Sequence, residues 1–380
     1  MIDYFDITVD GTNFPQIGKQ LTTEQPGGAT TRSFTEVKVR VASGAPHFYA
    51  RVETRAKRMR FWGSPAAWLQ CHNGMGSNDF QLLVKSSVML VFETLKIQVP
   101  ASVMSAVTTG DYNVHAVDVA EQYRMPHALI GPLCDNIRRH GESSLQSVPL
   151  EKGIGVRLWP NSRERQVIMY DKRHYFLDGL SKHKTKLLGK MPRDFNRVGT
   201  SLEFWRMMDE ILEQGIRIEA RLKLTLNNKS NPFNKGWHWK PETARELHRK
   251  VVESIPLVDL PPIPAQEQLL ATAKPEHKKL IALWLGGRDI RQFSNSDATY
   301  FRHRKALIAQ CGFDISIPPV PDCGIRWADV VSPNSIIEVP AWAKESKFVY
   351  EPEHSIGFDS PTHNQRAWLR PDPVTYMGKA

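Results

Sequence analysis

Residues 216–226 read IRIEARLKLTL, and this stretch decides how the chain folds. Small or aliphatic residues occupy every second position from Ile216 to Leu226, and charged residues or threonine occupy the positions between them. Strict alternation of this kind predicts a β-strand with one face buried and the other open to solvent or to a ligand. Antiparallel sheets commonly leave one face open in this way. The stretch therefore predicts an antiparallel sheet with helices on one face.

Weaker patterns on both sides of this strand complete the expected domain. Runs typical of strands occur at 37–41, 47–54, 112–121, 154–159 and 166–171. Helical periodicity occurs at 64–69, 79–95, 126–140, 175–188 and 202–212. Some of these helical segments begin with a capping residue or a proline, as helices often do. The mixture predicts an α+β fold.

A proline cluster indicates where the domains divide. Prolines at positions 256, 261, 262 and 264 cannot continue a helix or a central strand, so we expect a sheet domain at 1–254 and a linker at 255–265. Residues 266–315 have the pattern of a small helical module similar to a helix–turn–helix. Residues 316–380 are rich in proline and show little periodicity, which predicts an extended tail of unknown role.

The composition favours an anionic partner. The chain has 380 residues, of which 41% are hydrophobic, so a wholly disordered protein is excluded. The 50 lysines and arginines outnumber the 40 acidic residues, which leaves a formal charge of +10. This excess favours nucleic acid first and an acidic membrane surface second, although many soluble proteins are mildly basic without such a partner.

Several absences from the sequence predict a cytoplasmic protein. No run of about 18 uncharged apolar residues occurs, which excludes a membrane span. The opening residues 1–6 carry two acids and no basic segment, so we expect no secretory signal. The four cysteines are scattered and form no CxxC pair, which is typical of reduced thiols.

Six short stretches occur in an order that resembles a known family. They are Met1-Ile2-Asp3, SPAAWLQCHNG at 64–74, Asp118 within a strand, RQVIMYDK at 165–172, RIEARLK at 217–223, and an aromatic and arginine-rich helix near Tyr300. The ordered set resembles the gene II/X replication initiators of filamentous phages and related plasmids. The resemblance covers roughly residues 1–315, and nothing we recognise covers the tail.

The resemblance implies rolling-circle replication initiation. A tyrosine would attack one origin phosphodiester, form a 5′-phosphotyrosine and leave a 3′-hydroxyl that primes synthesis, and the same protein would later rejoin the strand. Carried over to this chain, the nucleophile is Tyr170, and residues 1–254 form the nicking–joining domain, a divergent relative of the His-hydrophobic-His endonucleases. The implied partners are origin DNA, double- and single-stranded, with a host helicase and polymerase. A single family-type tyrosine implies either a homodimer or a second nucleophile, for which Tyr175 lies near in sequence.

The residues around Tyr170 fit this chemistry. A phenol with a pKa near 10 is a poor nucleophile unless a cation or metal stabilises the phenolate. Lys172 follows by two residues, so in a strand it projects from the same face, where it would hold the phosphate or lower the pKa of the tyrosine. The alternative is an ordinary sheet tyrosine whose hydroxyl reaches the edge.

Acidic residues within the strands suggest a metal site. A hard cation, Mg²⁺ or Mn²⁺, would neutralise the attacked phosphate and prefers carboxylate oxygens, which makes Asp118 and Glu219 candidate ligands and His72 a candidate third. No His-x-His pair occurs, although the endonuclease superfamily binds its metal with one. The alternatives are a hydrogen bond from Asp118 to a helix N-terminus or a buried arginine, an exposed ion-pair ladder at Glu219 and a helix-end hydrogen bond at His72.

Basic residues interleaved with aromatic ones predict the DNA contacts. Phosphates follow basic side chains and bases stack on rings, while recognition helices place contacts in their first turns. Solvated strand edges and a plain helical packing module are the alternatives. The candidate DNA-binding residues are Arg51, Arg55, Arg58, Arg60, Arg165, Arg217, Arg221, Tyr300, Arg302, Arg304 and Lys305.

The sequence therefore predicts a metal-dependent DNA nickase and strand transferase that starts rolling-circle replication. A non-catalytic origin-binding protein or repressor is the alternative, and a single-strand-binding module on the same sheet is a third. Adduct formation with DNA and sensitivity to chelation would separate the enzyme from both.

Overall fold

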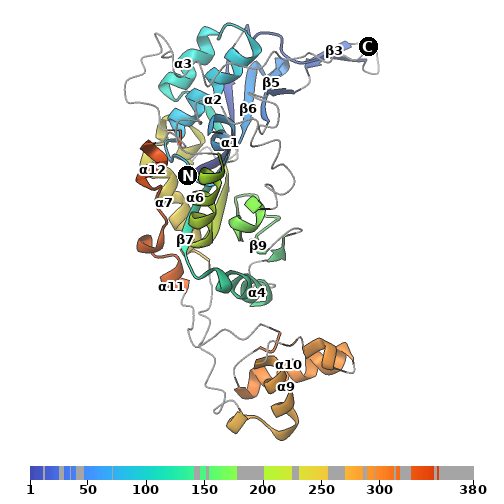
Figure 1. Cartoon of the computed structure of the whole chain (residues 1–380). Coiled ribbons are helices and arrows are strands. Elements are labelled where there is room, and N and C mark those ends of the chain that lie inside the picture. The colour runs from blue at the N-terminus through green and yellow to red at the C-terminus, as the bar shows by residue number, and fades with distance from the viewer. Residues whose placement is uncertain are drawn as a thin grey trace.

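Figure 1 shows the chain as a computed structural model. The structure describes residues 1–11, 13–24, 30–34, 36–39, 47–70, 72–140, 146–150, 154–177, 201–224, 231–255, 270–285, 288, 290–294, 296–311, 314–316, 327–345 and 349–350.

A large antiparallel sheet organises the described residues. Nine strands pair in the order β4-β5-β6-β1-β7-β11-β10-β9-β8, and every pair is antiparallel. Their bounds are β4 Val37–Val39, β5 Phe48–Glu53, β6 Arg58–Gly63, β1 Ile2–Asp10, β7 Asn113–Arg124, β11 Gly215–Lys223, β10 Arg165–Tyr170, β9 Gly155–Leu158 and β8 Val148–Pro149. A separate hairpin joins β2, Gln20–Glu24, to β3, Thr30–Phe34. The strand predicted at 216–226 is β11, which lies in the middle of the sheet, and residues 225–226 lie outside the described ranges.

The helices and the sheet together make the fold α+β, as predicted. The helices are α1 Pro65–Gln70, α2 Phe80–Leu95, α3 Ala101–Thr109, α4 Ile130–His140, α6 Ser201–Glu213, α7 Pro241–Glu253, α9 Pro275–Leu285, α10 Asp297–Cys311, α11 Trp327–Val330 and α12 Ala341–Glu345. The helix predicted at 175–188 falls mostly outside the described residues. No described helix is long and apolar enough to cross a membrane.

The main core lies on one face of the sheet. Phe5 of β1 and Ile218 of β11 are fully buried on this face. The ring of Phe80 in α2 packs edge-on against Phe5 at 5.9 Å. His248 of α7 donates from Nε2 to the carbonyl of Ile218, 2.9 Å away. The alternation seen in the sequence is therefore the alternation between this core and the opposite, polar face.

The prediction that helices cover only one face is wrong for α6. Gln122 of β7 pairs with Arg217, so its side chain lies on the polar face, and it donates to the carbonyls of Ile211 and Leu212 at the end of α6. A second, smaller core explains this position, because Met208 and Leu212 of α6 are buried in a cluster with Met75.

The segment predicted as an extended tail contributes to the packing of the fold where it is described. Ala343 of α12 joins the cluster with Met208, and Trp327 of α11 joins the main core. The backbone amide of Ile337 donates to the carbonyl of Gln122, 2.7 Å away. The described part of residues 316–380 therefore includes short helices held against the sheet.

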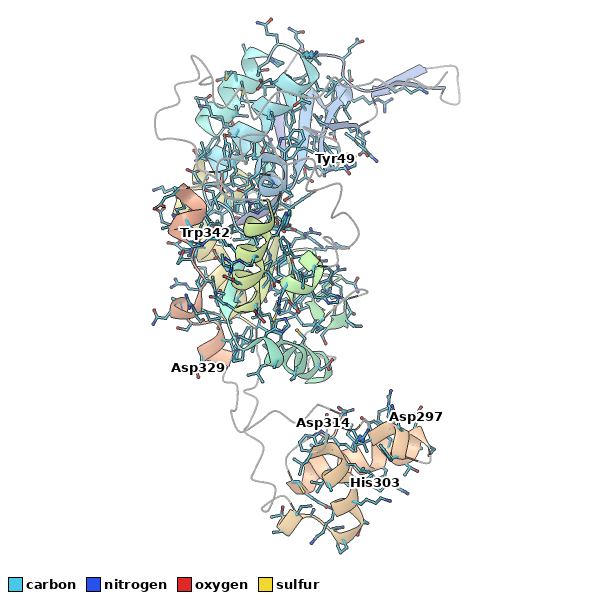
Figure 2. The ribbon with its side chains drawn as sticks, viewed as in Figure 1. Tyr49, Asp297, His303, Asp314, Asp329 and Trp342 are labelled. Atoms are coloured by element: carbon cyan, nitrogen blue, oxygen red, sulfur yellow. The ribbon has the colours of Figure 1, made fainter. Side chains whose placement is uncertain are left out.

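The helices α9 and α10 share a hydrophobic core of their own. Ile281 and Trp284 of α9 are buried with Tyr300 and Leu307 of α10. Figure 2 labels Asp297, His303 and Asp314 on this unit. The residues that would link it to the sheet, 256–269, lie outside the described ranges, so the domain boundaries stay predictions.

Candidate active site on the polar face of the sheet

Two neighbouring strands bring the predicted nucleophile to a carboxylate. Tyr170, the last residue of β10, pairs with Arg217 of β11, and Glu219 lies two residues further along β11 on the same face. The Tyr170 hydroxyl donates to Oε1 of Glu219 at 2.5 Å. The two residues are 49 positions apart in the sequence, and the pairing of β10 with β11 brings them into contact.

A buried arginine lies beside this pair. Arg217 is 1% exposed, and its Nε donates to Glu219 Oε1 at 2.9 Å. Its Nη1 donates to the carbonyl of Gly74 at 3.3 Å, and its Nη2 lies 3.4 Å from Oδ1 of Asp3. This Nη2 is buried and makes no hydrogen bond among the described residues. A guanidinium this deeply buried requires carboxylate partners, which Asp3 and Glu219 provide.

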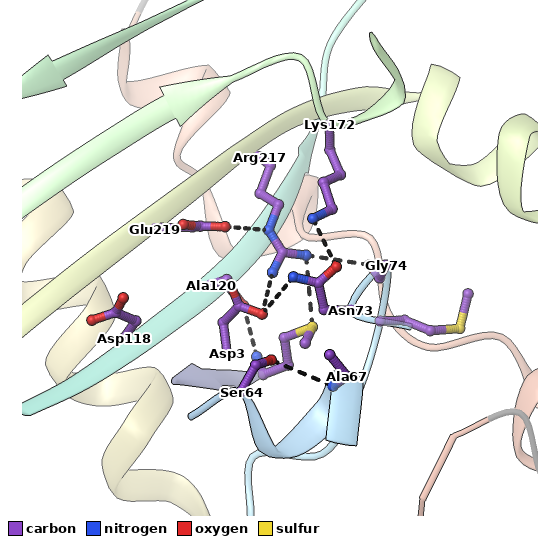
Figure 3. Close-up of polar contacts among 12 residues, drawn as sticks. Asp3, Ser64, Ala67, Asn73, Gly74, Asp118, Ala120, Lys172, Arg217 and Glu219 are labelled. Atoms are coloured by element: carbon purple, nitrogen blue, oxygen red, sulfur yellow. Dashed lines mark hydrogen bonds and ion pairs between the residues drawn. The ribbon is translucent and has the colours of Figure 1, made fainter. Parts of the chain in front are cut away.

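A lysine completes the group through an amide bridge. Lys172 donates from Nζ to Oδ1 of Asn73 at 3.0 Å, and Asn73 donates from Nδ2 to Oδ1 of Asp3 at 3.0 Å. Figure 3 shows Lys172, Asn73, Asp3 and Arg217 converging from separate segments of the chain. The set formed by Asp3, Asn73, Tyr170, Lys172, Arg217 and Glu219 is called the tyrosine site below.

Burial controls the protonation of the tyrosine site. Burial and, to a smaller extent, the positive charge of Arg217 together lower the pKa of Lys172 from 10.5 to about 8. Burial likewise raises the pKa of Tyr170 well above 10, and the negative charge of Glu219 adds to the increase. Although burial acts to raise the pKa of Asp3, Arg217 and Lys172 keep it below its ordinary value. Tyr170 is therefore a neutral phenol with a carboxylate in position to take its proton.

The tyrosine hydroxyl is close to its partners but shielded from solvent. Tyr170 is 7% exposed, and the ring of Tyr175 packs edge-on against it at 5.1 Å between centroids. Tyr175 is more exposed than Tyr170 and follows it by only five residues. The side chain of Tyr170 is therefore almost wholly shielded from solvent in this structure.

The three predicted metal ligands are not brought together. Asp118 is held by Arg221, whose Nε donates to it at 2.7 Å, and burial raises the pKa of Asp118 to about 6 in spite of that arginine. His72 is buried beside Gln70, with 3.5 Å between Nδ1 and Nε2. Within the described ranges, no three His, Cys, Asp or Glu side chains are grouped to hold a metal ion. The set Asp118, Glu219 and His72 therefore does not fit a metal site in this arrangement.

Asp3 and Glu219 are two carboxylates of the tyrosine site with the chemistry to hold a cation. Both contact the same guanidinium, that of Arg217. Mg²⁺ is commonly held by one or two carboxylates together with substrate phosphate oxygens, so this pair has the required chemistry. A cation bound there would share these oxygens with Arg217.

Two predicted DNA contacts are corrected by burial. Arg217 is 1% exposed inside the tyrosine site, so it does not belong to an exposed basic surface along which DNA would lie. Tyr300 is 5% exposed in the core between α9 and α10, which removes its ring from DNA. The burial of Tyr300 could not be predicted from the sequence, because the polar and aromatic residues of α10 obscure the helical periodicity that separates buried from exposed positions.

The other predicted DNA contacts lie at or near the surface. Five of them have charged, polar or aromatic partners: Arg58 with Glu53, Arg60 with Asp6, Arg165 with Ser254 and the ring of Trp159, Arg221 with Asp118, and Arg304 with Asp314. The remaining four, Arg51, Arg55, Arg302 and Lys305, are exposed. Their arrangement is compatible with DNA contact.

Sequence reasoning missed the roles of Asp3 and Asn73. Both occur in stretches that carry the resemblance, the opening Met-Ile-Asp and the segment 64–74, but neither was assigned a function. An acid near a chain start and an asparagine in a glycine-containing turn are too common to indicate a site. The contact of Asn73 with both Lys172 and Asp3 could be found only in the folded chain.

Comparison with known proteins identifies the family. The family model described as the N-terminal part of the phage replication-associated protein, the gene 2 protein, matches residues 14–240, which include Asn73, Tyr170, Lys172, Arg217 and Glu219. The replication-associated protein of Enterobacteria phage I2-2, which carries the same description, is 24% identical over an alignment of 273 residues that covers 67% of this chain and 69% of that protein. Because the family model covers more than half of the sequence, the chain belongs to this family of phage replication-associated proteins.

Proposed function

We propose that this protein initiates rolling-circle replication of phage DNA by nicking one origin strand and later rejoining it. The observation that carries the proposal is the hydrogen bond from the Tyr170 hydroxyl to Glu219, next to two buried cationic side chains. Membership of a replication-associated family supports the biological setting. The tyrosine site supplies a nucleophile, a base and positive charge, which are the groups that phosphodiester transfer requires.

In the nicking step, the phenolic oxygen of Tyr170 attacks the scissile phosphorus while Glu219 accepts the phenolic proton. Nη2 of Arg217 and Nζ of Lys172 stabilise the charge that develops on the phosphoryl oxygens. The bond from phosphorus to the 3′-oxygen breaks, and that oxygen leaves as a hydroxyl after taking a proton from Lys172. A pKa of about 8 suits Lys172 for this donation near neutral pH.

Rejoining is the same sequence in reverse. A 3′-hydroxyl gives its proton to neutral Lys172 and attacks the phosphotyrosine, and Glu219 returns the proton to the departing Tyr170 oxygen. One phosphodiester is exchanged for another through the tyrosyl ester, so no ATP is consumed. Tyr175, whose ring touches that of Tyr170, is the second hydroxyl available to a single chain.

A divalent cation is part of the proposal. We expect Mg²⁺ or Mn²⁺ to be held by Asp3 and Glu219 together with the substrate phosphate, where it would supply charge neutralisation. Glu219 is kept from the set predicted from the sequence, and Asp3 replaces Asp118 and His72. Chelation with EDTA should therefore abolish nicking, and calorimetric titration of the DNA-free chain with Mn²⁺ should detect a site that Asp3→Asn weakens.

The helical unit supplies the proposed contact with double-stranded origin DNA. Arg302 and Lys305 are exposed in the second and third turns of α10, and recognition helices place their contacts in the N-terminal part of the helix. A host helicase and polymerase, and a second protomer, remain predicted partners. A non-catalytic origin-binding protein is the second candidate function, and the burial of the Tyr170 hydroxyl is the observation that favours it.

A pair of tyrosine variants tests the proposal. Supercoiled origin plasmid is incubated with the protein and Mg²⁺, and relaxed DNA and an SDS-resistant protein–DNA adduct are measured. Tyr170→Phe should abolish both while origin binding is retained, and the matched control Tyr175→Phe should still nick. Adduct formation by Tyr170→Phe would refute the nucleophile assignment. Absence of any adduct with the unaltered protein on its own origin would favour the non-catalytic candidate.

A further inference from the structure

The polar face that bears the tyrosine site extends across the neighbouring strands as far as β5. Arg221 of β11 pairs with Asp118 of β7, which pairs with Tyr4 of β1. Asp6 of β1 pairs with Trp62 of β6, which pairs with Tyr49 of β5. Directly paired residues project from the same face, so these six side chains share the face that bears Tyr170. Figure 2 labels Tyr49 at the far end of this path.

One arrangement of side chains occurs twice along this path. The guanidinium of Arg221 donates from Nε and Nη2 to both oxygens of Asp118 and lies 5.5 Å from the ring centre of Tyr4. The guanidinium of Arg60 donates from the same two nitrogens to both oxygens of Asp6 and lies 5.3 Å from the ring centre of Trp62. Each unit thus consists of a clamped arginine beside an aromatic ring.

The exposed part of each unit is the cation. The side chains of Arg60 and Arg221 are 40% and 38% exposed, whereas those of Asp6 and Asp118 are 8% and 7% exposed. The carboxylates therefore lie beneath the guanidinium groups and orient them, and in both units Nη1 is the nitrogen that the carboxylate does not engage. Clamped arginines lose little side-chain entropy when they bind phosphate.

The path ends in a stacked aromatic pair. The rings of Tyr49 and Trp62 lie 5.3 Å apart between centroids, and their planes differ by only 4°. The ring of His47 lies 6.0 Å from Tyr49, and Nζ of the exposed Lys38 lies 6.0 Å from the same ring. Flat, half-buried rings flanked by cations are surfaces on which unpaired bases stack.

We propose that this face, from Arg221 through Tyr4, Arg60 and Trp62 to Tyr49, is a track that binds single-stranded DNA. The track rests on the proposed function in one respect, because its role would be to lead the cleaved strand to or from the tyrosine site. Five strand spacings separate β10 from β5, or about 24 Å. That length holds about seven nucleotides at the stacked spacing of about 3.4 Å, and fewer if the strand is stretched.

A single strand fits this face better than a duplex does. Bases in a duplex are stacked on each other and are not available to Trp62 or Tyr49, whereas every unpaired base presents a face to an aromatic ring. The arginines, in contrast, would bind the phosphates of either form. Dependence on the rings is therefore the property that distinguishes a single-strand track from a general basic surface.

An oligonucleotide-binding experiment tests the track without any cleavage. The full chain, without added divalent cation, is titrated into fluorescent oligothymidine of about eight nucleotides, chosen to span the track, and anisotropy is measured. Trp62→Ala should weaken binding by roughly five- to 150-fold, the effect of one lost base stack. The matched control is Trp237→Ala, since Trp237 is 45% exposed with Nζ of Lys235 5.0 Å from its ring, but lies in the short helix 236–238, outside the track. Binding by this control should be unchanged.

A second probe separates stacking from charge. An abasic oligonucleotide of the same length keeps the phosphates and removes the bases, so Trp62→Ala and the unaltered chain should bind it equally. Equal binding of oligothymidine by both proteins, or the same loss with the abasic probe, would overturn the track. Trp62→Leu, which keeps apolar cover on the strand, repeats the test should the alanine variant fail to fold.

The nicking assay keeps the two proposals apart. Normal oligothymidine binding by Trp62→Ala, with an adduct that still requires Tyr170, would overturn the track alone. Weakened binding by Trp62→Ala, in a chain that forms no adduct with its own origin, would support the track and overturn the nicking proposal alone.

Discussion

The proposed base, Glu219, allows the sharpest prediction. Glu219→Gln keeps an oxygen that can accept the hydrogen bond from Tyr170 but can no longer take its proton. A phenol of ordinary pKa is ionised to roughly one part in 10³ at pH 7, and burial lowers that fraction further at Tyr170. Loss of a positioned general base costs on the order of 10²- to 10⁴-fold in rate. We therefore expect adduct formation to slow by that factor while origin binding is retained.

The same substitution also weakens the fold, and the assay must separate the two effects. Glu219 is the partner of the buried Arg217, and removing one member of such a pair costs about 3–5 kcal/mol. The matched control is Glu121→Gln, because Glu121 is a buried glutamate on β7 that pairs with Ile218 and so faces away from Tyr170. Its ion pairs are with the Met1 ammonium and Arg245, both at 3.4 Å.

Single-turnover adduct formation, measured below the unfolding temperature of each variant, gives the rates. Glu121→Gln should lose stability but keep its rate, whereas Glu219→Gln should lose both. The assignment of Glu219 as the base is refuted if Glu219→Gln forms the adduct within about tenfold of the unaltered chain, since a general base is worth more than that.

Three further predictions concern charge and packing. Lys172, whose pKa is about 8, is positively charged below that pH, so the rate of adduct formation should decline above about pH 8. Lys172→Arg should remove that decline, because arginine stays charged. A variant with the same pH–rate profile as the unaltered chain would contradict the prediction. Burial lowers the pKa of His248 from 6.5 to about 4, so the unfolded chain binds more protons than the folded chain between these pH values. The contribution of His248 to the free energy of unfolding, complete above pH 6.5, should therefore fall by about 3 kcal/mol as the pH drops to 4. Urea unfolding of His248→Gln should show a smaller dependence of stability on pH over this range, and an equal dependence would contradict the prediction. A Cβ at Gly215 would lie 1.9 Å from the carbonyl oxygen of Tyr123, so Gly215→Ala should destabilise the fold by about 1–3 kcal/mol in thermal unfolding. The control Gly131→Ala, where the nearest atom to the added Cβ would be 3.7 Å away, should leave the melting temperature unchanged. Equal melting temperatures for the two variants would show that β7 and β11 can separate to accept the methyl group.

Local patterns predicted six of the nine strands of the main sheet, but not β1, β6 or β8. The alternation in β11 identified both its buried face and its polar face, because side chains in a strand point alternately to the two sides. The same rule placed Arg217 and Glu219 together, since they are two residues apart. The resemblance in the segment 165–172 directed attention to Tyr170.

The burial and the ion-pair partners of the polar side chains could not be predicted in the same way. The alternation in β11 left the polar face open to solvent or ligand, yet Arg217 is 1% exposed, and the turn at Gly74 and the side chain of Met1 contact its guanidinium. Asp118 was expected at a metal, but pairing of β7 with β11 places it opposite Arg221. Burial and charge pairing depend on segments far away in the chain.

The amino-acid sequence by itself determined six of the nine strands of the main sheet, the buried face of β11, the basic charge and the family, because each depends on residue types at short or fixed spacing. Only the tertiary structure decided that Tyr170 meets Glu219, that Asp3 and Asn73 join them, and that the paired aromatic rings continue along the same face. The contacts of the tyrosine site join residues 49, 70 and 99 positions apart. Strand register and the packing of helices on the sheet set such distances, and neither can be read from a local pattern.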